Sequence, residues 1–385
     1  MQFCDLNKQY KRIESEVTSR TKAVLQHQKF IMGPEVQELE KRLADFVGVK
    51  HVIPCASGTD ALTIPLMAYN LEKTDAVFVP SFTFFASAES ISLAGGTPVF
   101  IDSDASSFNI SVVSLRKAIE STIEENALTP RGIMAVDLFG QPADYTEIHD
   151  IANQYGLFII EDAAQSFGAV YRDKRAGSLG NVGATSFFPS KPLGCYGDGG
   201  AIFTDDDQLA EIMRSISIHG KGKDKYDNIR IGLNSRLDTL QAAILLAKLD
   251  VFEDEIKLRN KVAEHYSQIL SSLFELPVVC PDRTSVWAQY TIKTSGQAAR
   301  NKIVEQLKQQ GIPTAVYYPT PIHLSTAYKN LEYKRGYLPV CEKLSEQVLS
   351  LPMHPYLNEE NIQRIASTIK SINLLDIIAK QGSVL

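Results

Sequence analysis

Four short apolar runs, separated by stretches with helical periodicity, mark the first half of the chain. They cover residues 76–79, 97–101, 132–136 and 157–160, and each is apolar throughout rather than alternating with polar residues. Strands of a parallel sheet buried on both faces have this pattern, and strands that alternate with helices build such sheets. The pattern therefore predicts an α/β protein with a mostly parallel central sheet.

Helix signals precede the first of these runs. Residues 10–29 have the spacing of an amphipathic helix, and a second helix is predicted to begin at Pro34, because proline suits the first helical turn. Apolar residues from Val36 to Phe46 recur at helical spacing, and Gly48 is placed to end that helix.

The second half of the chain has a different organisation. A long helix is predicted from about Leu237 onward, and it continues past residue 250 as a bridge to another unit. Short strands then alternate with helices, including a strand at 286–293 that contains Trp287, and a last helix covers 358–377.

The length of 385 residues exceeds what one hydrophobic core usually supports. We therefore expect two domains, a large cofactor-binding domain at 1–250 and a smaller α/β domain at 251–385. The N-terminal helix is free to pack against the smaller one.

Composition excludes several classes of function. The net charge is −6 without a basic run, so we expect no nucleic-acid partner. The polar N-terminus lacks the apolar core of a signal peptide, and no apolar stretch approaches the roughly 18 residues of a membrane span. The chain is therefore expected to be soluble and cytoplasmic. Its five cysteines form no CxxC pair and its histidines no HxxxH pair, so no metal site is predicted.

One lysine lies in a loop of unusual composition. Lys191 is flanked by Pro189 and Pro192 and is followed by four glycines within nine residues. The prolines restrict the backbone and the glycines permit tight turns, which indicates a shaped loop rather than a helix or a strand. Lysine amines form Schiff bases with carbonyl compounds such as pyridoxal phosphate (PLP) when burial lowers their pKa. A lysine that faces water in a surface loop is the alternative.

A small-residue turn follows the short apolar strand predicted at 51–54. Its residues are Ser57, Gly58, Thr59 and Asp60, and an apolar helix comes next. Backbone N–H groups at a helix start favour an anion, so a phosphate is one interpretation. Ordinary N-capping by Ser57 or Thr59 is the other.

Two further residues follow predicted strands at the edge where α/β folds bind ligands. Phe84 lies in the loop SFTFF and has the shape to stack on a flat ring, or to fill a core. Asp162 ends the strand near residue 160, and it either pairs with a protonated ring nitrogen of a cofactor or caps the next turn.

Together these motifs resemble the DegT/DnrJ/EryC1/StrS family of sugar-nucleotide aminotransferases, which have the fold of type I PLP enzymes. The likeness runs essentially end to end. It is carried by GPEVQELE, ASGTDAL, EDAAQSFGA, SFFPSKPLGCYGDGGAIFT, NSRLDTLQAA and YYPTPIHL.

The resemblance implies roles for the catalytic residues. Lys191 would form the Schiff base with PLP and then act as general acid and base. Asp162 would hold the pyridinium nitrogen, and Gln165 would approach the ring hydroxyl. Phe84 would stack on the ring.

It also implies how the cofactor phosphate is bound. Gly58, Thr59 and Ser186 would contact the phosphate, and Asn234 would reach it from the partner subunit, which makes the site that of a homodimer.

For the substrate, the resemblance points to Arg236 as a ligand of a sugar carboxylate, and to Tyr317, Tyr318 and His323 as further contacts. The family often has histidine at the position of Tyr317, so this chain departs from the pattern there.

The activity implied is amino transfer from L-glutamate to a keto sugar nucleotide, with pyridoxamine phosphate as intermediate and 2-oxoglutarate as product. A UDP-linked 3-oxo uronate is the expected acceptor. A 3- or 4-keto-6-deoxy hexose linked to UDP, dTDP or GDP is the alternative substrate. Two alternatives belong to another class: the protein is a non-catalytic PLP-binding regulator, or the lysine loop is merely a turn without a role in cofactor binding.

Overall fold

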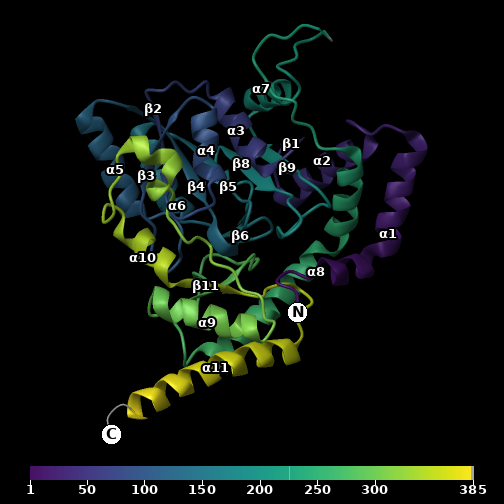
Figure 1. Ribbon diagram of the computed structural model, residues 1–385. Helices are drawn as coiled ribbons and strands as arrows, with labels where there is room; N and C mark the ends of the chain where they lie inside the picture. The colour runs from purple at the N-terminus through teal and green to yellow at the C-terminus, as the bar shows by residue number, and fades with distance from the viewer. Residues whose placement is uncertain (225, 383–385) are drawn as a thin grey trace.

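The computed structural model describes the backbone of residues 1–224 and 226–382, and the side chains through residue 372. Its centre is a seven-stranded sheet (Figure 1), whose strands in spatial order are β1 (His51–Cys55), β9 (Gly200–Thr204), β8 (Val182–Ser186), β5 (Phe158–Asp162), β4 (Thr129–Val136), β2 (Asp75–Pro80) and β3 (Thr97–Ile101). β9 runs antiparallel to both of its neighbours, whereas the pairs from β8 to β3 are parallel. The predicted mostly parallel sheet is confirmed.

Both faces of this sheet are buried. In β2, Val77 and Val79 pack into one apolar cluster, while Ala76 and Phe78 pack into another on the opposite face. All four side chains are inaccessible to solvent. A strand with two buried faces needs no polar residues between its apolar ones, which explains the continuous runs in the sequence.

Helices cover each face. The first face packs against α3 (Gly58–Ala68), α4 (Ala86–Leu93) and α7 (Asp207–Ser217). The second packs against α2 (Pro34–Val47), α5 (Val112–Glu125), α6 (Tyr145–Tyr155) and the first half of α8 (Thr239–Leu270). The ends of α2 are as predicted: Pro34 is its first residue, and Gly48 ends it in a left-handed conformation, donating to the carbonyl of Ala44.

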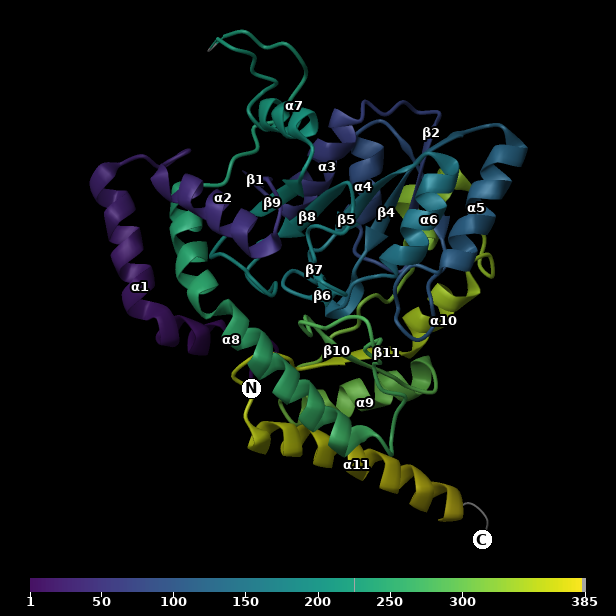
Figure 2. The ribbon, with the colours of Figure 1, turned by 180° about the vertical axis from the view of Figure 1, so that it is seen from behind.

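Helix α8 continues without a break from the central sheet to a second, smaller core (Figure 2). That core lies around the antiparallel pair of β10 (Tyr290–Lys293) and β11 (Val348–Leu351), which packs against α9 (Gln297–Gln309) and α11 (Glu359–Gly382). Residue 250 therefore lies inside a helix, and the division into two domains there stays a prediction. The end of the second predicted domain, residues 383–385, lies outside the described residues.

The strand predicted at 286–293 is shorter than expected. β10 begins only at Tyr290, and Trp287 has a positive φ of 49°. The backbone of Val286 donates instead to the carbonyl of Gly140, which ties this segment to the loop after β4. The remaining elements are α1 (Leu6–His27), β6 (Val170–Tyr171), β7 (Lys174–Arg175), α10 (Pro339–Gln347), and 3-10 turns at η1 (Leu138–Gly140), η2 (Ile322–Leu324) and η3 (Thr326–Leu331).

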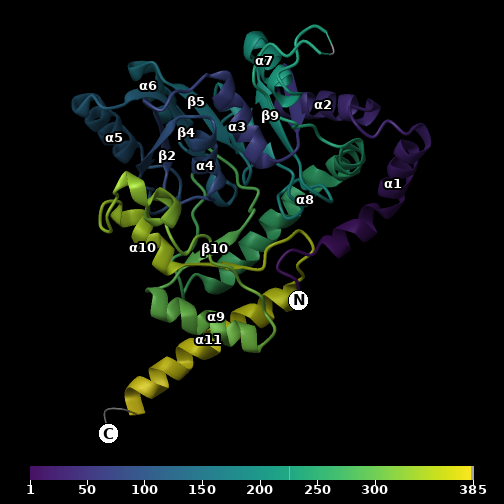
Figure 3. The same cartoon turned by 45° about the horizontal axis from the view of Figure 1, so that its top comes forward.

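Two segments extend away from the body of the protein at opposite ends. The described residues between α7 and α8 project beyond the central sheet, and α11 lies at the other end, beyond the small sheet (Figure 3). Among the described helices, none is both long enough and apolar enough to cross a membrane.

Candidate active site

Lys191 and Asp162 meet at the carboxyl edge of the central sheet. Asp162 is the last residue of β5, and Lys191 comes from the loop that joins β8 to β9. Both line one cavity of about 450 Å³. Burial lowers the pKa of the Lys191 amine, and the Asp162 carboxylate partly opposes that shift. A lysine in this position is available for chemistry, so the interpretation of a solvated surface lysine is not supported.

The lysine loop is held by its own backbone. Lys191 N–H donates to the carbonyl of Phe188, and Cys195 N–H donates to the carbonyl of Phe187. A Cβ atom on Gly194 would lie 2.5 Å from the Phe188 carbonyl oxygen. Only glycine fits that close approach, which accounts for one of the glycines that the sequence places after the lysine.

The Asp162 carboxylate has a hydrogen-bond donor on each oxygen. Ser87 Oγ donates to Oδ2 at 2.8 Å, and the Ala164 N–H donates to Oδ1 at 3.2 Å. Burial raises the pKa of Asp162, while the bond from Ser87 and the nearby Lys191 lower it. Asp162 therefore caps the following turn through Oδ1 and also lines the cavity, so the two interpretations of this residue are compatible.

The start of α3 forms another wall of the cavity. Ser57 caps the helix by accepting a hydrogen bond from Asp60 N–H at 3.1 Å, so the capping interpretation is confirmed. Gly58 and Thr59 line the cavity just inside the helix, where backbone N–H groups have no partner within the helix. A Cβ on Gly58 would lie 2.5 Å from Cβ of Ser186, so glycine allows the helix end to meet β8. Because Ser57 caps the helix through the N–H of Asp60, the N–H groups of Gly58 and Thr59 are left for an anion in the cavity.

The side chain of Gln165 has a fixed orientation. Its Oε1 accepts from the Phe139 N–H at 2.9 Å, and its Nε2 donates to the hydroxyl of Tyr318 at 3.1 Å. Tyr318 is half-buried, and burial raises the pKa of its hydroxyl. Gln165, in the turn after β5, and Tyr318, from the C-terminal part of the chain, are therefore joined across the cavity.

Phe84 lies at the cavity mouth rather than in the core. Its side chain is 55% exposed, and its ring centroid is 6.2 Å from that of Tyr318. The alternative of a core phenylalanine is wrong. An exposed ring beside an active-site cavity is free to contact a bound ring.

The cavity thus brings together most residues that the sequence singled out. Those that line it are Gly58, Thr59, Phe84, Asp162, Gln165, Ser186, Lys191, Tyr317 and Tyr318. Their roles toward a cofactor or substrate stay predictions.

Asn234 and Arg236 lie outside the cavity lining of their own chain. The Arg236 guanidinium donates to Oδ1 of Asn234. Between them, the buried Ser235 donates to Asp60 at 2.7 Å and accepts from Ala56 N–H at 3.1 Å. This segment is therefore anchored beside the start of α3, with Asn234 facing solvent.

His323 is not placed to contact a substrate. It is 2% exposed, its Nδ1 lies 2.7 Å from Ser81 Oγ, and its Nε2 lies 3.3 Å from the Glu342 carboxylate. Burial lowers the pKa of the His323 imidazole. The structure therefore assigns His323 a structural contact between η2 and α10, and this geometry does not support the substrate role predicted for it.

Two residues at or beside the cavity had no signal in the sequence. Ser87 contacts Asp162 from α4, and Gln289 reaches the cavity from the segment before β10. The Oε1 of Gln289 is buried without a hydrogen-bond partner in the described structure. Neither residue belongs to a motif, and a serine in the first turn of a helix such as α4 looks like any other helical serine.

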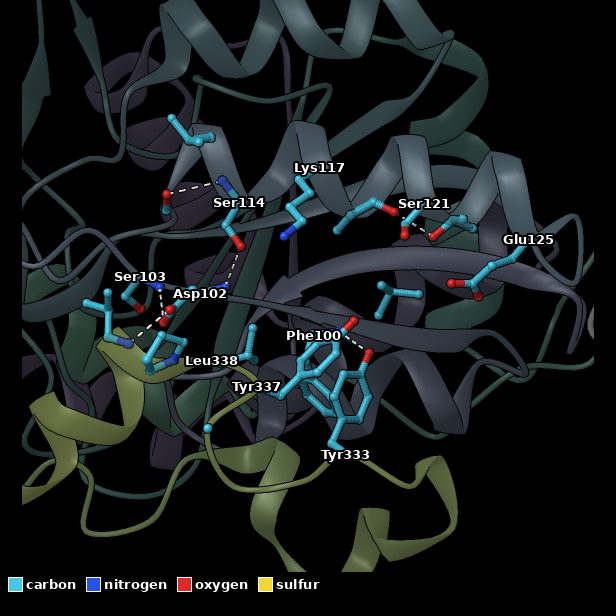
Figure 4. Close-up of a pocket in the computed structure, with 18 of the residues that line it drawn as sticks. Phe100, Asp102, Ser103, Ser114, Lys117, Ser121, Glu125, Tyr333, Tyr337 and Leu338 are labelled. Carbon is cyan, nitrogen blue, oxygen red and sulfur yellow. Dashed lines mark hydrogen bonds between the residues drawn. The ribbon is translucent and has the colours of Figure 1, made fainter.

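A second cavity of about 610 Å³ lies between α5 and residues 333–340 (Figure 4). It shares no lining residue with the Lys191 cavity. The Asp102 carboxylate at its edge accepts from the N–H groups of Val340 and Cys341, and Tyr333 accepts from the Phe100 N–H. Its lining also contains the amine of Lys117 and the carboxylate of Glu125, but Asp102 is engaged in holding α10.

Comparison with known proteins assigns the chain to a class. Residues 11–370 match the DegT/DnrJ/EryC1/StrS aminotransferase family. The chain belongs to this family. It is similar to UDP-2-acetamido-2-deoxy-3-oxo-D-glucuronate aminotransferase of Pseudomonas aeruginosa, with 48% identity over 96% of this chain and 99% of that protein. It is also 42% identical to the pleiotropic regulatory protein of Geobacillus stearothermophilus, over 95% of this chain and 96% of that one.

Solved structures agree with this assignment. The crystal structure of a DegT DnrJ EryC1 StrS aminotransferase from Brucella abortus matches with a TM-score of 0.93 and 49% identity, over 97% of this chain and 99% of that chain. The structure of ntda from Bacillus subtilis with bound cofactor PMP matches with a TM-score of 0.86 and 31% identity, over 94% of this chain and 82% of that chain.

Proposed function

We propose that this protein transfers the amino group of L-glutamate to a keto sugar nucleotide, with PLP as its cofactor. One observation carries the proposal: Lys191 and Asp162 share a cavity with the open start of α3. An amine, a buried carboxylate and an anion site are what a phosphorylated pyridine aldehyde requires. The residues present therefore fit PLP.

Each of these residues has a distinct task. Bound PLP supplies an electron sink for the electrons of the bond broken at the amino acid's α-carbon. Asp162 accepts the hydrogen bond of the protonated pyridine nitrogen, and Gln165 faces the ring hydroxyl. The N–H groups of Gly58 and Thr59 and the hydroxyl of Ser186 bind the phosphate.

Lys191 moves the proton. In the first half-reaction its Nζ takes the α-proton of glutamate. In the second, it delivers a proton to the sugar carbon that was the ketone and is now bonded to nitrogen. A lysine serves as both base and acid when its pKa approaches the working pH. The lowered pKa of Lys191 acts in that direction.

For the acceptor, we propose UDP-2-acetamido-2-deoxy-3-oxo-glucuronate, which would become the 3-amino sugar. The similarity to the Pseudomonas aeruginosa aminotransferase, which extends over nearly the whole of both chains, supports this choice. The product would serve surface polysaccharide (O-antigen) biosynthesis in the cytoplasm. A 3- or 4-keto-6-deoxy hexose nucleotide is the rival acceptor, and the name of a relative from Aneurinibacillus thermoaerophilus, a transaminase for a dTDP-linked 3-amino-3,6-dideoxy sugar, supports the 3-keto form.

We also propose that the active enzyme is a homodimer. Among the described residues that line the cavity, Lys191 is the one cation, and the carboxylates of Asp162 and Asp198 line the same cavity. Glutamate, a uronate and a diphosphate all carry negative charge, so further cations have to come from outside this lining. The exposed apolar side chains of Phe30 and Ile31 lie beside the segment of Arg236, because Ile31 bridges to Asp238. A second copy that covers them would bring its own Asn234 and Arg236 toward this cavity.

Absorbance spectroscopy tests both half-reactions. L-Glutamate is expected to convert the PLP form into the pyridoxamine form, and UDP-2-acetamido-2-deoxy-3-oxo-glucuronate is expected to reverse the change. Lys191→Ala serves as the control and should abolish both changes. Reversal by a 3- or 4-keto-6-deoxy hexose nucleotide alone would replace the proposed acceptor. A protein that binds PLP and reacts with no amino donor would favour a regulator and overturn the proposal.

A further inference from the structure

Asp137 is a buried carboxylate that directly follows β4, next to the strand that carries Asp162. It is inaccessible to solvent and does not line the cavity. Its backbone N–H donates to the carbonyl of Asp162 at 3.1 Å, which continues the parallel ladder of β4 and β5 by one step. Because Val136 faces the cavity, the side chain of Asp137 points to the opposite face of the strand.

Three donors surround the Asp137 carboxylate. Ala143 N–H and Tyr145 Oη donate to Oδ1 at 2.9 and 3.1 Å, and Ser166 Oγ donates to Oδ2 at 2.8 Å. Among the described contacts of this carboxylate there is no cationic partner. A buried carboxylate without a cation is costly to keep, so a role beyond packing is indicated.

The donors belong to two segments, and both segments hold Gln165. Ser166 directly follows Gln165 in the turn after β5. Ala143 closes the loop after β4, and that loop contains Phe139, whose N–H binds Oε1 of Gln165. Phe139 has a positive φ of 59°, so the loop holds it in a conformation that is unfavourable for a phenylalanine.

We propose that Asp137 is a positioning residue of the active site: it fixes the amide of Gln165 by anchoring both segments that hold it. Since Phe139 N–H occupies Oε1, the Nε2 donor is directed into the cavity toward Tyr318. The inference rests on the proposed function, in which Gln165 faces the hydroxyl of the PLP ring. It adds Asp137 to the residues that shape the active site, although Asp137 does not line the cavity.

Asp137→Asn replaces the ionisable carboxyl with an amide of the same shape. The amide oxygen can still accept from Ala143 and Tyr145, whereas the amide nitrogen faces the hydroxyl of Ser166. We expect a shift in the absorbance of bound PLP and in its pH dependence. We also expect kcat to fall about tenfold with KM for glutamate changed less than about twofold, as for the loss of one well-placed hydrogen bond.

A double-mutant comparison separates positioning from plain destabilisation. If Asp137 acts through Gln165, Asp137→Asn adds nothing to the absorbance shift of Gln165→Leu. Glu161→Gln is the matched control. Glu161 directly precedes Asp162 in β5 and is an equally buried carboxylate, but it accepts from the N–H groups of Gly177 and Leu179. This substitution should lower Tm without shifting the absorbance.

Additive shifts in the double variant, or an equal shift from Glu161→Gln, would overturn the proposal. Should Asp137→Asn fail to fold, Ser166→Ala tests the same link, and an unchanged absorbance there would overturn it as well. Wild-type protein that binds PLP without reacting with glutamate would instead overturn the proposed function, since the absorbance comparison needs only bound PLP.

Discussion

The hydroxyl of Ser87 donates a hydrogen bond of 2.8 Å to Oδ2 of Asp162. It joins the first turn of α4 to the end of β5, and it stabilises the charged form of a carboxylate whose pKa burial raises. The ionisation of Asp162 therefore depends on a residue that is far away in the sequence.

Replacing Ser87 with alanine removes this bond. We expect the pKa of Asp162 to rise further, so that the acidic limb of the kcat/KM profile moves to higher pH. The loss of about 1 kcal/mol for one hydrogen bond predicts roughly fivefold lower activity at neutral pH. Ser90→Ala on the same helix is the control, because Ser90 is equally buried and its hydroxyl donates to the carbonyl of Ser87 rather than to Asp162. An acidic limb that stays in place in Ser87→Ala would contradict the prediction.

Gly58→Ala tests the contact between α3 and β8. Its new Cβ would meet Cβ of Ser186 at 2.5 Å, a distance that requires one of the two backbones to move. We expect PLP to bind at least about tenfold more weakly, measured by titration of the cofactor-free protein. Gly156→Ala is the matched control. Gly156 has a positive φ of 66° and no atom near the added Cβ. Its replacement by alanine should therefore cost roughly 1 kcal/mol of stability and leave the affinity for PLP unchanged.

His323→Gln separates a structural role from substrate binding. The imidazole is buried between Ser81 and Glu342, so its replacement should lower Tm by several degrees while KM for the sugar nucleotide changes less than about twofold. Thermal unfolding and steady-state kinetics on the same preparation give both numbers. A large rise in KM with an unchanged Tm would restore the role predicted from the sequence.

Asp137 predicts a pH dependence of stability. Burial raises the pKa of this carboxyl to about 7, against about 3.9 in an unfolded chain. Between these values the folded protein binds more protons than the unfolded protein, so the contribution of Asp137 to the free energy of unfolding falls as pH rises from about 4 to 7. Asp137→Asn should therefore be less stable than the wild type at pH 5 and compare more favourably at pH 8. A Tm difference that is independent of pH would contradict this.

Much of the fold could be read from contiguous residues. Apolar runs without alternation indicated strands buried on both faces, and Pro34 and Gly48 marked the ends of α2. The strand expected at 286–293 failed in its first half, because the backbone of Val286 pairs with Gly140 instead of a neighbouring strand. Local propensity contains no information on that distant partner.

The candidate site divides in the same way. Lys191 and Asp162 stood out because a proline- and glycine-rich loop and a strand-end carboxylate are unusual in their local surroundings. The sequence by itself thus determined the fold class, the family and the residues with visible chemistry. Only the tertiary structure decided that His323 is buried between Ser81 and Glu342, and that Ser87 contacts Asp162. It also decided that Asp137 anchors both holders of Gln165. Those contacts depend on which strands lie side by side, and the order β1-β9-β8-β5-β4-β2-β3 arises from packing between segments that are distant in the chain.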